Sequence, residues 1–113
     1  MTALEPGVLV RAAAVALEHE PLPADQVRAG EPTTGMLVLD ERDGHEIGVW
    51  EMTPGSATDT EVDEVFVVLA GRATVSFEDG PEIDLGPGSV VRLTDGMRTT
   101  WTVHETLRKV YLA

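Results

Sequence analysis

Four carboxylates stand close together in the middle of the chain, at Asp59, Glu61, Asp63 and Glu64. Grouped carboxylates can bind a hard divalent cation, and a carboxyl whose pKa is raised by burial can act as a general acid or base. A calcium loop needs a glycine at its turn, whereas the apolar run from Val65 to Leu69 follows here at once. We therefore interpret the first three carboxylates as solvated negative charge on a loop and a strand edge.

Glu64 differs from the other three because a strand is expected to include it. Side chains alternate between the two faces of a strand, so if Glu64 faces the interior, Phe66 and Val68 do as well, and Asp63 faces solvent. An apolar interior raises the pKa of a carboxyl, as a general acid or base near neutral pH requires. Two roles stay open for Glu64: a catalytic acid or base, and a structural acceptor held by hydrogen bonds or by an arginine.

Short apolar runs separated by Gly, Pro and Asp follow one another from Met36 to the end of the chain. Such runs are typical of strands, and no helical period competes with them. The pattern predicts an all-β fold, an antiparallel sandwich or a closed barrel. Within it, Asp79-Gly80 favours a type I′ turn between two paired strands. Strands are expected at residues 36–39, 46–52, 62–69, 73–77, 81–85, 90–93, 99–103 and 107–112.

The first 35 residues give a weaker pattern. The stretch from Val8 to Leu17 mixes helix-favouring alanines with strand-favouring valines, and we expect a strand or an extended arm there. Prolines and glycines indicate irregular chain between Glu20 and Gly35, with one short helical turn at residues 24–27. The chain is the length of one domain, in which we expect an N-terminal arm over residues 1–35 and a barrel over residues 36–113.

Composition excludes several classes of function. The net charge of −12 disfavours nucleic-acid and anionic-membrane partners, which both need basic residues. The chain has no cysteine, so thiolate metal sites and thiol catalysis are excluded. No serine has a nearby His-acid arrangement, and no glycine loop precedes a helix. The apolar stretch near the start is interrupted by Arg11, so we expect no signal peptide or membrane span, and a cytoplasmic location.

Three segments of the chain together resemble a known family: Gly48–Gly55, Asp63–Gly71 and Gly86–Tyr111. They are similar to the small single-domain cupins of the RmlC-like superfamily, especially the ethanolamine-utilisation and ureidoglycine aminohydrolase types. The resemblance covers about two thirds of the chain in several ordered segments. It implies a jelly-roll β-barrel, frequently a homodimer in which N-terminal strands pack across the subunits. It implies no single activity, because one fold hosts many functions.

The resemblance also identifies what is missing from the site. Cupins usually hold a metal with a His-x-His pair, a glutamate and a later histidine. The glutamate corresponds to Glu64, but the pair would fall within residues 57–60, Ala-Thr-Asp-Thr, and the last ligand position holds Thr99. One carboxylate cannot replace most of the hydration shell of a transition metal. We therefore expect a cupin site without a metal ligand set and without a bound cofactor.

Alternation predicts which side chains line the barrel. Thr99, Trp101 and Val103 share one face of their strand. Arg108 and Lys109 are expected to form salt bridges with the acidic surface, with Lys109 and Tyr111 on one face. The candidate ligand-binding residues are Trp50, Glu64, Phe66, Thr99 and Trp101, and Glu64 is the candidate catalytic residue.

Three functions are compatible with this site. The first is a binding protein that holds a small polar or carboxylate metabolite in the barrel without the usual metal. The second is an enzyme of small metabolites, such as an isomerase, epimerase or lyase, with Glu64 as general acid or base. The third is a structural or regulatory dimer with a filled barrel and no ligand.

Overall fold

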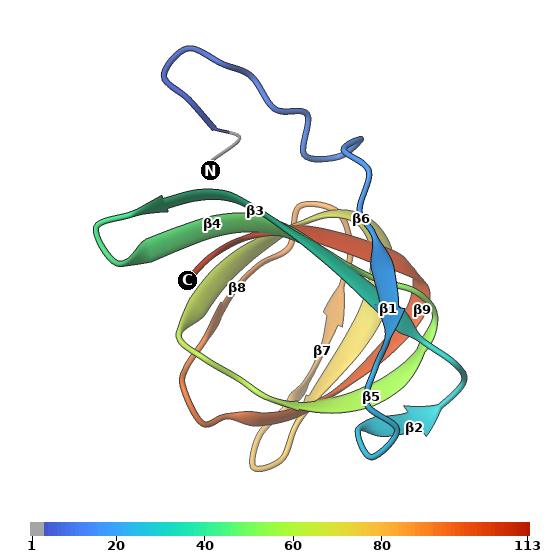
Figure 1. Ribbon diagram of the computed structural model, residues 1–113. Coiled ribbons are helices and arrows are strands. Elements are labelled where there is room, and N and C mark those ends of the chain that lie inside the picture. The colour runs from blue at the N-terminus through green and yellow to red at the C-terminus, as the bar shows by residue number, and fades with distance from the viewer. Residues whose placement is uncertain (1–3) are drawn as a thin grey trace.

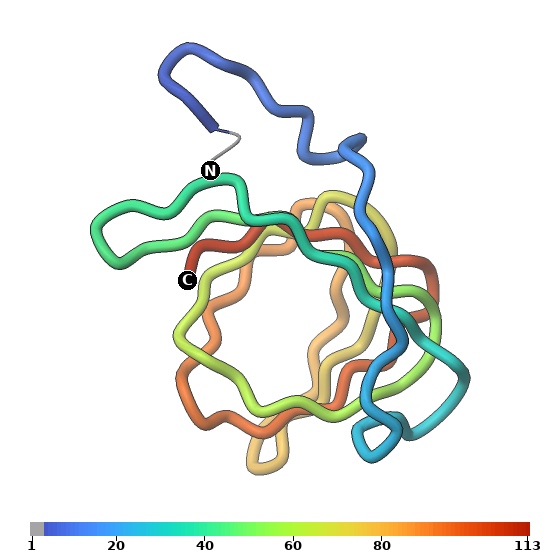
Figure 2. The backbone as a smooth tube through the Cα atoms, viewed as in Figure 1, coloured from blue at the N-terminus to red at the C-terminus, as the bar shows by residue number. Residues whose placement is uncertain are grey.

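In the computed structural model, which describes residues 4–113, nine antiparallel strands form one sheet that curls round a common axis (Figures 1 and 2). The predicted all-β fold is confirmed. No helix in the described part of the chain is long and apolar enough to span a membrane. The strands are β1 (His19–Pro21), β2 (Val27–Ala29), β3 (Thr33–Arg42), β4 (His45–Met52), β5 (Gly55–Thr60), β6 (Glu64–Phe77), β7 (Glu82–Leu85), β8 (Val90–Leu93) and β9 (Arg98–Leu112).

The long strand β9 connects the two parts of the sheet. Along one edge it pairs first with β5, where Asp59 lies opposite Thr99, and then with β4, where Val49 lies opposite Val110. Its other edge pairs with β6, which in turn holds β7 and β8. Every strand that carries a candidate site residue is thus β9 itself or a direct neighbour of β9.

Two predicted strand breaks are bulges within longer strands. The chain was expected to interrupt pairing near Gly71 and again between residues 103 and 107, but β6 and β9 continue through both places, with shifts of register between Val68 and Ala73. Gly71 has a φ of 91°, and a Cβ there would overlap the carbonyl oxygen of Thr106. The glycine therefore permits a close approach of two paired strands and does not end either.

Three strands were not predicted from the sequence. β1 and β2 lie at the start of and within the segment from Glu20 to Gly35 that was expected to be irregular, where they pair with β3 and β5. The third is β5. β5 has the sequence Gly-Ser-Ala-Thr-Asp-Thr, in which glycine, aspartate and alanine are poor strand formers. It forms because it is flanked on both sides, by β9 over its whole length and by β2 at Ser56 and Ala57. Tertiary pairing overrides the local preference here.

The prediction of a type I′ turn at Asp79-Gly80 is wrong, although the pairing of β6 with β7 is confirmed. A type I′ turn needs positive φ at both central residues, and neither of these has it. Phe77 N–H donates to the carbonyl of Pro81, so three residues separate this hydrogen-bonded pair where a type I′ hairpin has two. Within the loop, Gly80 N–H donates to the carbonyl of Phe77. The two-residue turn of this kind is instead Asp43-Gly44, with φ of 52° and 77°, between β3 and β4.

The barrel core consists of the inward-facing side chains of the long strands. Phe66 is 1% exposed, and its ring centroid lies 5.6 Å from that of Trp101 in a tilted arrangement that aromatic pairs favour. Alternation explains much of the selection, because buried residues stand two positions apart in β6, at 66 and 68 and again at 73 and 75, and in β9 at 99, 101 and 103. The buried apolar cluster is Met52, Ala57, Phe66, Val68, Ala73, Val75, Leu85, Leu93, Trp101, Val103, Leu107 and Tyr111.

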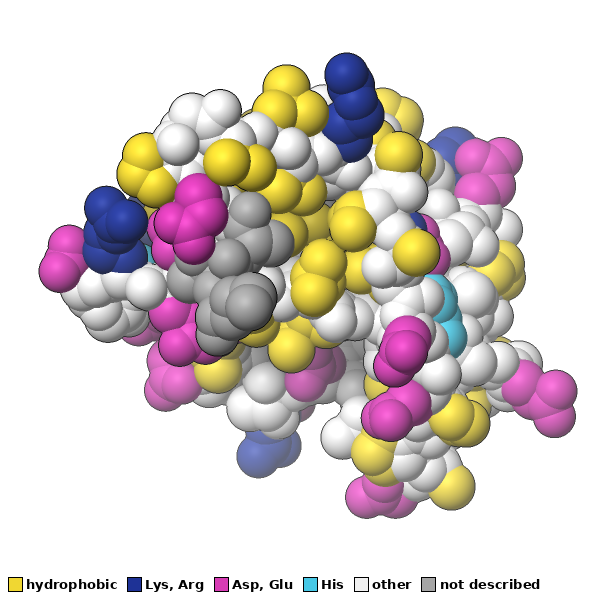
Figure 3. Space-filling view, turned by 45° about the horizontal axis from the view of Figure 1, so that its top comes forward, with side chains coloured by type: hydrophobic (Ala, Val, Ile, Leu, Met, Phe, Trp, Pro, Cys, Tyr) yellow, Lys and Arg dark blue, Asp and Glu magenta, His cyan; other side chains and the backbone are white. Residues whose placement is uncertain are grey.

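The N-terminal arm runs along the outside of the barrel. Leu4 N–H donates to the carbonyl of Leu39 in β3, and the arm then continues toward β1, which pairs with β3 (Figure 1). Val8 and Leu9 on the arm are 52% and 70% exposed. Figure 3 shows the face of the molecule around the arm, where hydrophobic side chains lie among acidic ones. The segment expected to be a strand or an extended arm is an extended arm with turns.

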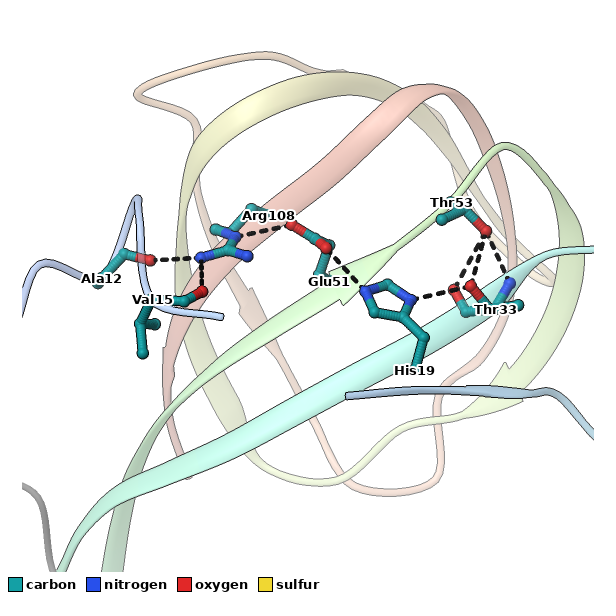
Figure 4. Close-up of polar contacts among 7 residues, drawn as sticks. All are labelled: Ala12, Val15, His19, Thr33, Glu51, Thr53 and Arg108. Atoms are coloured by element: carbon teal, nitrogen blue, oxygen red, sulfur yellow. Dashed lines mark hydrogen bonds and ion pairs between the residues drawn. The ribbon is translucent and has the colours of Figure 1, made fainter. Parts of the chain in front are cut away.

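Glu51 fastens this arm to the barrel (Figure 4). One of its oxygens accepts from Arg108 Nε at 2.7 Å, and the other contacts His19 Nε2 at 2.7 Å. Arg108 Nη1 also donates to the carbonyls of Ala12 and Val15, at 3.0 and 2.7 Å. Trp50 lines the pocket while its neighbour Glu51 faces the other side of β4, so the glutamate has a structural role outside the barrel.

These contacts determine the charge state of Glu51. Burial acts to raise its pKa, but the hydrogen bonds and positive charges of Arg108 and His19 outweigh that effect and hold the pKa below its ordinary value of 4.5. The folded protein therefore binds this proton less readily than the unfolded chain. Stability from the Glu51 contacts is present above the ordinary pKa and is lost as the pH falls through the lower pKa of the folded state.

We predict that Glu51→Gln destabilises the protein at neutral pH and reduces its sensitivity to acid. Losing the charged acceptor of Arg108 costs about 1–3 kcal/mol. As the pH falls from about 6 to about 3, the wild type loses this contribution and the variant has none to lose. Urea midpoints measured across that range should therefore converge. Glu105→Gln, at an exposed surface pair, is the control, and parallel curves for wild type and Glu51→Gln would contradict the prediction.

Candidate functional site

A pocket of about 410 Å³ opens inside the barrel. Its walls come from β3, β4, β5, β6 and β9, the strands that adjoin β9 and the hairpin partner of β4. The pocket combines aromatic rings with ionisable groups, as small-molecule sites commonly do. The side chains of greatest chemical interest on its walls are Glu46, Trp50, Asp59, Glu61, Glu64, Trp101, Lys109 and Tyr111.

Lys109 lies at the centre of this arrangement. Its Nζ is 2.6 Å from Glu64 Oε2, and the two side chains are only 7% and 12% exposed. The same Nζ lies 4.4 Å from the ring centroid of Phe66, 4.7 Å from that of Trp50 and 4.9 Å from that of Trp101. Ring faces carry negative potential, so all three attract the ammonium. One carboxylate and three aromatic rings together hold a buried cation.

The expectation that Lys109 pairs with the acidic surface is wrong, because its partner Glu64 lies inside. The inward positions of β9 are odd-numbered both before and after the exposed residues 104–106. Lys109 and Tyr111 therefore share a face with Thr99 and Trp101, and all four are buried. The predicted grouping of Lys109 with Tyr111 on one face is confirmed. The signal was present in the sequence, but residues 104–106 were interpreted as a break between two strands.

Glu61 is also an interior residue, and its interpretation as solvated charge is wrong. It is 7% exposed, and its Oε2 accepts hydrogen bonds from Thr99 Oγ1 at 2.6 Å and Trp101 Nε1 at 2.9 Å. The connection from β5 to β6 folds against the loop between β8 and β9, since Glu61 N–H donates to the carbonyl of Met97 and the Glu61 carbonyl accepts from Gly96 N–H. This places the side chain beneath the loop and toward β9.

Asp59 and Asp63 remain exposed, as expected, but they differ in role. Asp63 lies outside the pocket, where its Oδ1 accepts from Asp95 N–H at 2.9 Å. Asp59 lies on the rim of the pocket. Surrounding protein raises the pKa of Asp59 above its ordinary value of 3.8, and the nearby negative charge of Glu61 raises it further.

Tyr111 adds a neutral donor to the pocket. Its hydroxyl donates to Glu46 Oε2 at 2.6 Å, and burial, followed by this hydrogen bond and the charge of Glu46, raises the pKa of the phenol. The ring is accommodated because Gly48 in β4 has no side chain, and a Cβ there would overlap it. The phenol therefore stays protonated and binds a carboxylate within the barrel.

The five predicted ligand-binding residues divide into two groups. Trp50, Glu64 and Trp101 line the pocket. Phe66 and Thr99 lie behind its surface, at 1% and 3% exposed, where Phe66 packs against Lys109 and Thr99 holds Glu61. The structure thus brings all five together, and it gives Phe66 and Thr99 supporting positions.

The residues present do not fit the metal that the family resemblance implies. Glu64 Oε2 is engaged by the Lys109 ammonium, which would also repel a second cation next to it. Thr99, at the last ligand position, donates to Glu61. Within residues 4–113 no group of three or more His, Cys, Asp or Glu side chains is placed to hold a metal ion. The donor set of a cupin metal centre is therefore missing from this site.

Several solved structures are similar to this chain. A protein of unknown function from Rhizobium leguminosarum bv. viciae 3841 is 32% identical, covering 70% of this chain and 78% of that one, with a TM-score of 0.64. A DUF861 family protein of unknown function from Pseudomonas syringae pv. tomato DC3000 is 24% identical, covering 87% of this chain and 44% of that one, with a TM-score of 0.76.

A putative ethanolamine utilization protein Q from Salmonella typhimurium LT2 is 21% identical, covering 71% of this chain and 68% of that one, with a TM-score of 0.61. These last two likenesses show a shared fold. No curated protein matched the chain. The family model of the EutQ-like cupin domain matches residues 39–111, which include β4 to β8 and nearly all of β9. The chain therefore belongs to the EutQ-like cupin domain family.

Proposed function

We propose that this protein binds a small polar molecule in the barrel pocket, without a metal ion of the kind that cupins usually hold. The observation that carries the proposal is the pocket of about 410 Å³, which is within the range of small-molecule sites. Trp50 and Trp101 provide apolar walls, and carboxylates provide fixed acceptors beside them. A filled barrel without a ligand is less well supported, because the pocket opens directly beside Glu64.

The charges on the walls favour a ligand that donates hydrogen bonds. Four carboxylates line the pocket, at Glu46, Asp59, Glu61 and Glu64, against the single ammonium of Lys109. Glu64 neutralises that ammonium. Hydroxyl or amino groups would satisfy the free lone pairs of the other carboxylates, whereas a carboxylate ligand would be repelled. Of the two ligand classes expected from the sequence, the structure therefore supports a polar, donor-rich metabolite over a carboxylate.

An enzyme with Glu64 as the catalytic residue is the second candidate. It is favoured by the grouping of Glu64, Lys109 and Tyr111 on the walls of one partly apolar pocket, an arrangement typical of acid-base sites. In this reading Glu64, which lies beside Lys109, would be the proton acceptor, and the protonated phenol of Tyr111 would donate a hydrogen bond to the substrate. Isomerase, epimerase and lyase reactions all use such a pair.

We predict that Asp59→Asn stabilises the ligand-free protein. The pKa of Asp59 is higher in the folded state than in the unfolded chain. The stability of the wild type therefore falls as the pH rises through the interval between these two pKa values, and the variant avoids that loss. Thermal midpoints should be higher for Asp59→Asn at pH 7 and should approach the wild-type value at about pH 3. If the midpoint of Asp59→Asn at pH 7 is equal to or lower than that of the wild type, the surroundings do not disfavour the charged form of Asp59 as we infer.

We predict that a donor-rich probe binds the pocket and perturbs Trp50. Suitable probes are glycerol, ribose and ethanolamine, the last chosen because the Salmonella neighbour is described as an ethanolamine utilization protein. Titration should change the tryptophan fluorescence saturably, and Asp59→Asn should weaken the binding at least about tenfold, since it removes a charged acceptor. Glu105→Gln, far from the pocket walls, should leave it unchanged. The proposal fails if native mass spectrometry of protein from its own host shows no bound small molecule and no probe binds.

We also propose that the protein forms a homodimer in which the N-terminal arm contacts a second copy. Support comes from Val8 and Leu9, which are more than half exposed on the arm. Single exposed apolar residues are ordinary, but two neighbours on an extended segment are suited to a partner surface.

We predict that Val8→Lys/Leu9→Lys shifts the protein toward monomer, because two charges cannot be buried without partners. Light scattering after size exclusion measures the change. Val90→Lys is the control, since Val90 is 65% exposed on β8, away from the arm. A wild type that is monomeric at all concentrations, or an equal effect of the control substitution, would disprove this assembly.

A further inference from the structure

We propose that the Lys109 ammonium is the permanent cation of the barrel: it occupies the position beside Glu64 that a metal ion takes in metal-binding cupins, and its removal opens a site for a small external ammonium ion. This inference concerns the construction of the pocket. It holds whether or not the pocket also binds a metabolite, and it assigns a function to Lys109 that the sequence pattern did not predict.

The first observation is the close ion pair between Lys109 and Glu64. Their 2.6 Å contact joins two side chains that are both nearly buried, and Glu64 is the one residue that corresponds to a cupin metal ligand. Removing one partner of a buried pair leaves an uncompensated charge, which is strongly destabilising. The wall around it also carries Glu46, Asp59 and Glu61, so the local charge without Lys109 is entirely negative.

The second observation is that the remaining surroundings of Nζ are ring faces. Phe66, Trp50 and Trp101 lie 4.4 to 4.9 Å from it by their centroids. A ring face attracts an ammonium ion through its quadrupole, but it has no lone pair to coordinate a metal. The one indole N–H in this group that has a partner, that of Trp101, donates to Glu61. The site is therefore built for an ammonium ion and discriminates against a divalent metal.

The geometry suggests a chemical rescue experiment, in which a small amine replaces the side chain removed from Lys109. Replacing Lys109 by alanine removes three methylene groups and the ammonium, which together have the composition of n-propylammonium. We expect Lys109→Ala to have a lower thermal midpoint than the wild type, and n-propylammonium chloride to restore it saturably. The apparent affinity should be at least tenfold higher than any for the wild type, in which the position is filled. Binding should also exceed that of zinc or manganese chloride by tenfold or more.

Two controls separate charge from volume. Propan-1-ol has nearly the same shape as n-propylammonium without the charge, so it should stabilise Lys109→Ala much less. Lys109→Ala/Glu64→Gln lacks the carboxylate and should lose most of the response to the amine. Equal stabilisation by the alcohol, an undiminished response of the double variant, or tighter binding of either metal than of the amine would overturn the proposal.

The reciprocal variant tests the same pair from the other side. Glu64→Ala removes a group with the composition of acetate, so sodium acetate should stabilise this variant and n-propylammonium should not.

If Lys109→Ala does not fold by itself, it is refolded from urea with and without the amine, and near-ultraviolet circular dichroism of the two tryptophans measures recovery. Amine-dependent recovery supports the proposal, and failure of the amine to improve recovery contradicts it.

Discussion

Burial of the Glu64 and Lys109 charges is the constraint that organises the barrel interior. Each buried ion loses several kcal/mol of hydration, which one contact does not fully offset. The three rings around Nζ supply further attraction from different directions, and they are among the bulkiest parts of the core. Glu61 in turn anchors Trp101 through its indole N–H. The aromatic core, the ion pair and the second buried carboxylate therefore depend on one another.

Arg108, the neighbour of Lys109 on β9, connects the barrel interior to the N-terminal arm outside it. Lys109 faces inward and pairs with Glu64, while Arg108 faces outward and joins Glu51 to the N-terminal arm. Because both cations stand on the same stretch of strand, the register that places one also places the other. The arm and the pocket are thus attached to opposite faces of a single element, which holds them in a fixed relation.

Sequence patterns predicted those features that depend on local chemistry and failed where pairing over long distances decides. The all-β class, most strand positions and the shared face of Glu64, Phe66 and Val68 follow from turn residues and alternation. β5 was missed because its residues are poor strand formers that only their neighbours hold extended. Lys109 and Glu61 were assigned to the surface because charge normally implies solvent, and the partners that bury them, Glu64 and Trp101, are 45 and 40 residues away in the chain.

The bulge at Gly71 has a consequence for how β6 can vary in length. Before it, the inward positions are the even-numbered Glu64, Phe66 and Val68, and after it they are odd-numbered, beginning with Ala73 and Val75. The glycine therefore marks the point where the inward positions change from even to odd numbers. The six residues between Glu64 and Gly71 thus fix which side chains of β6 face the interior as well as where the bulge lies. Inserting or deleting one residue there would turn one half of the strand inside out, exposing core valines and burying polar groups. Length in this strand is consequently constrained as tightly as composition.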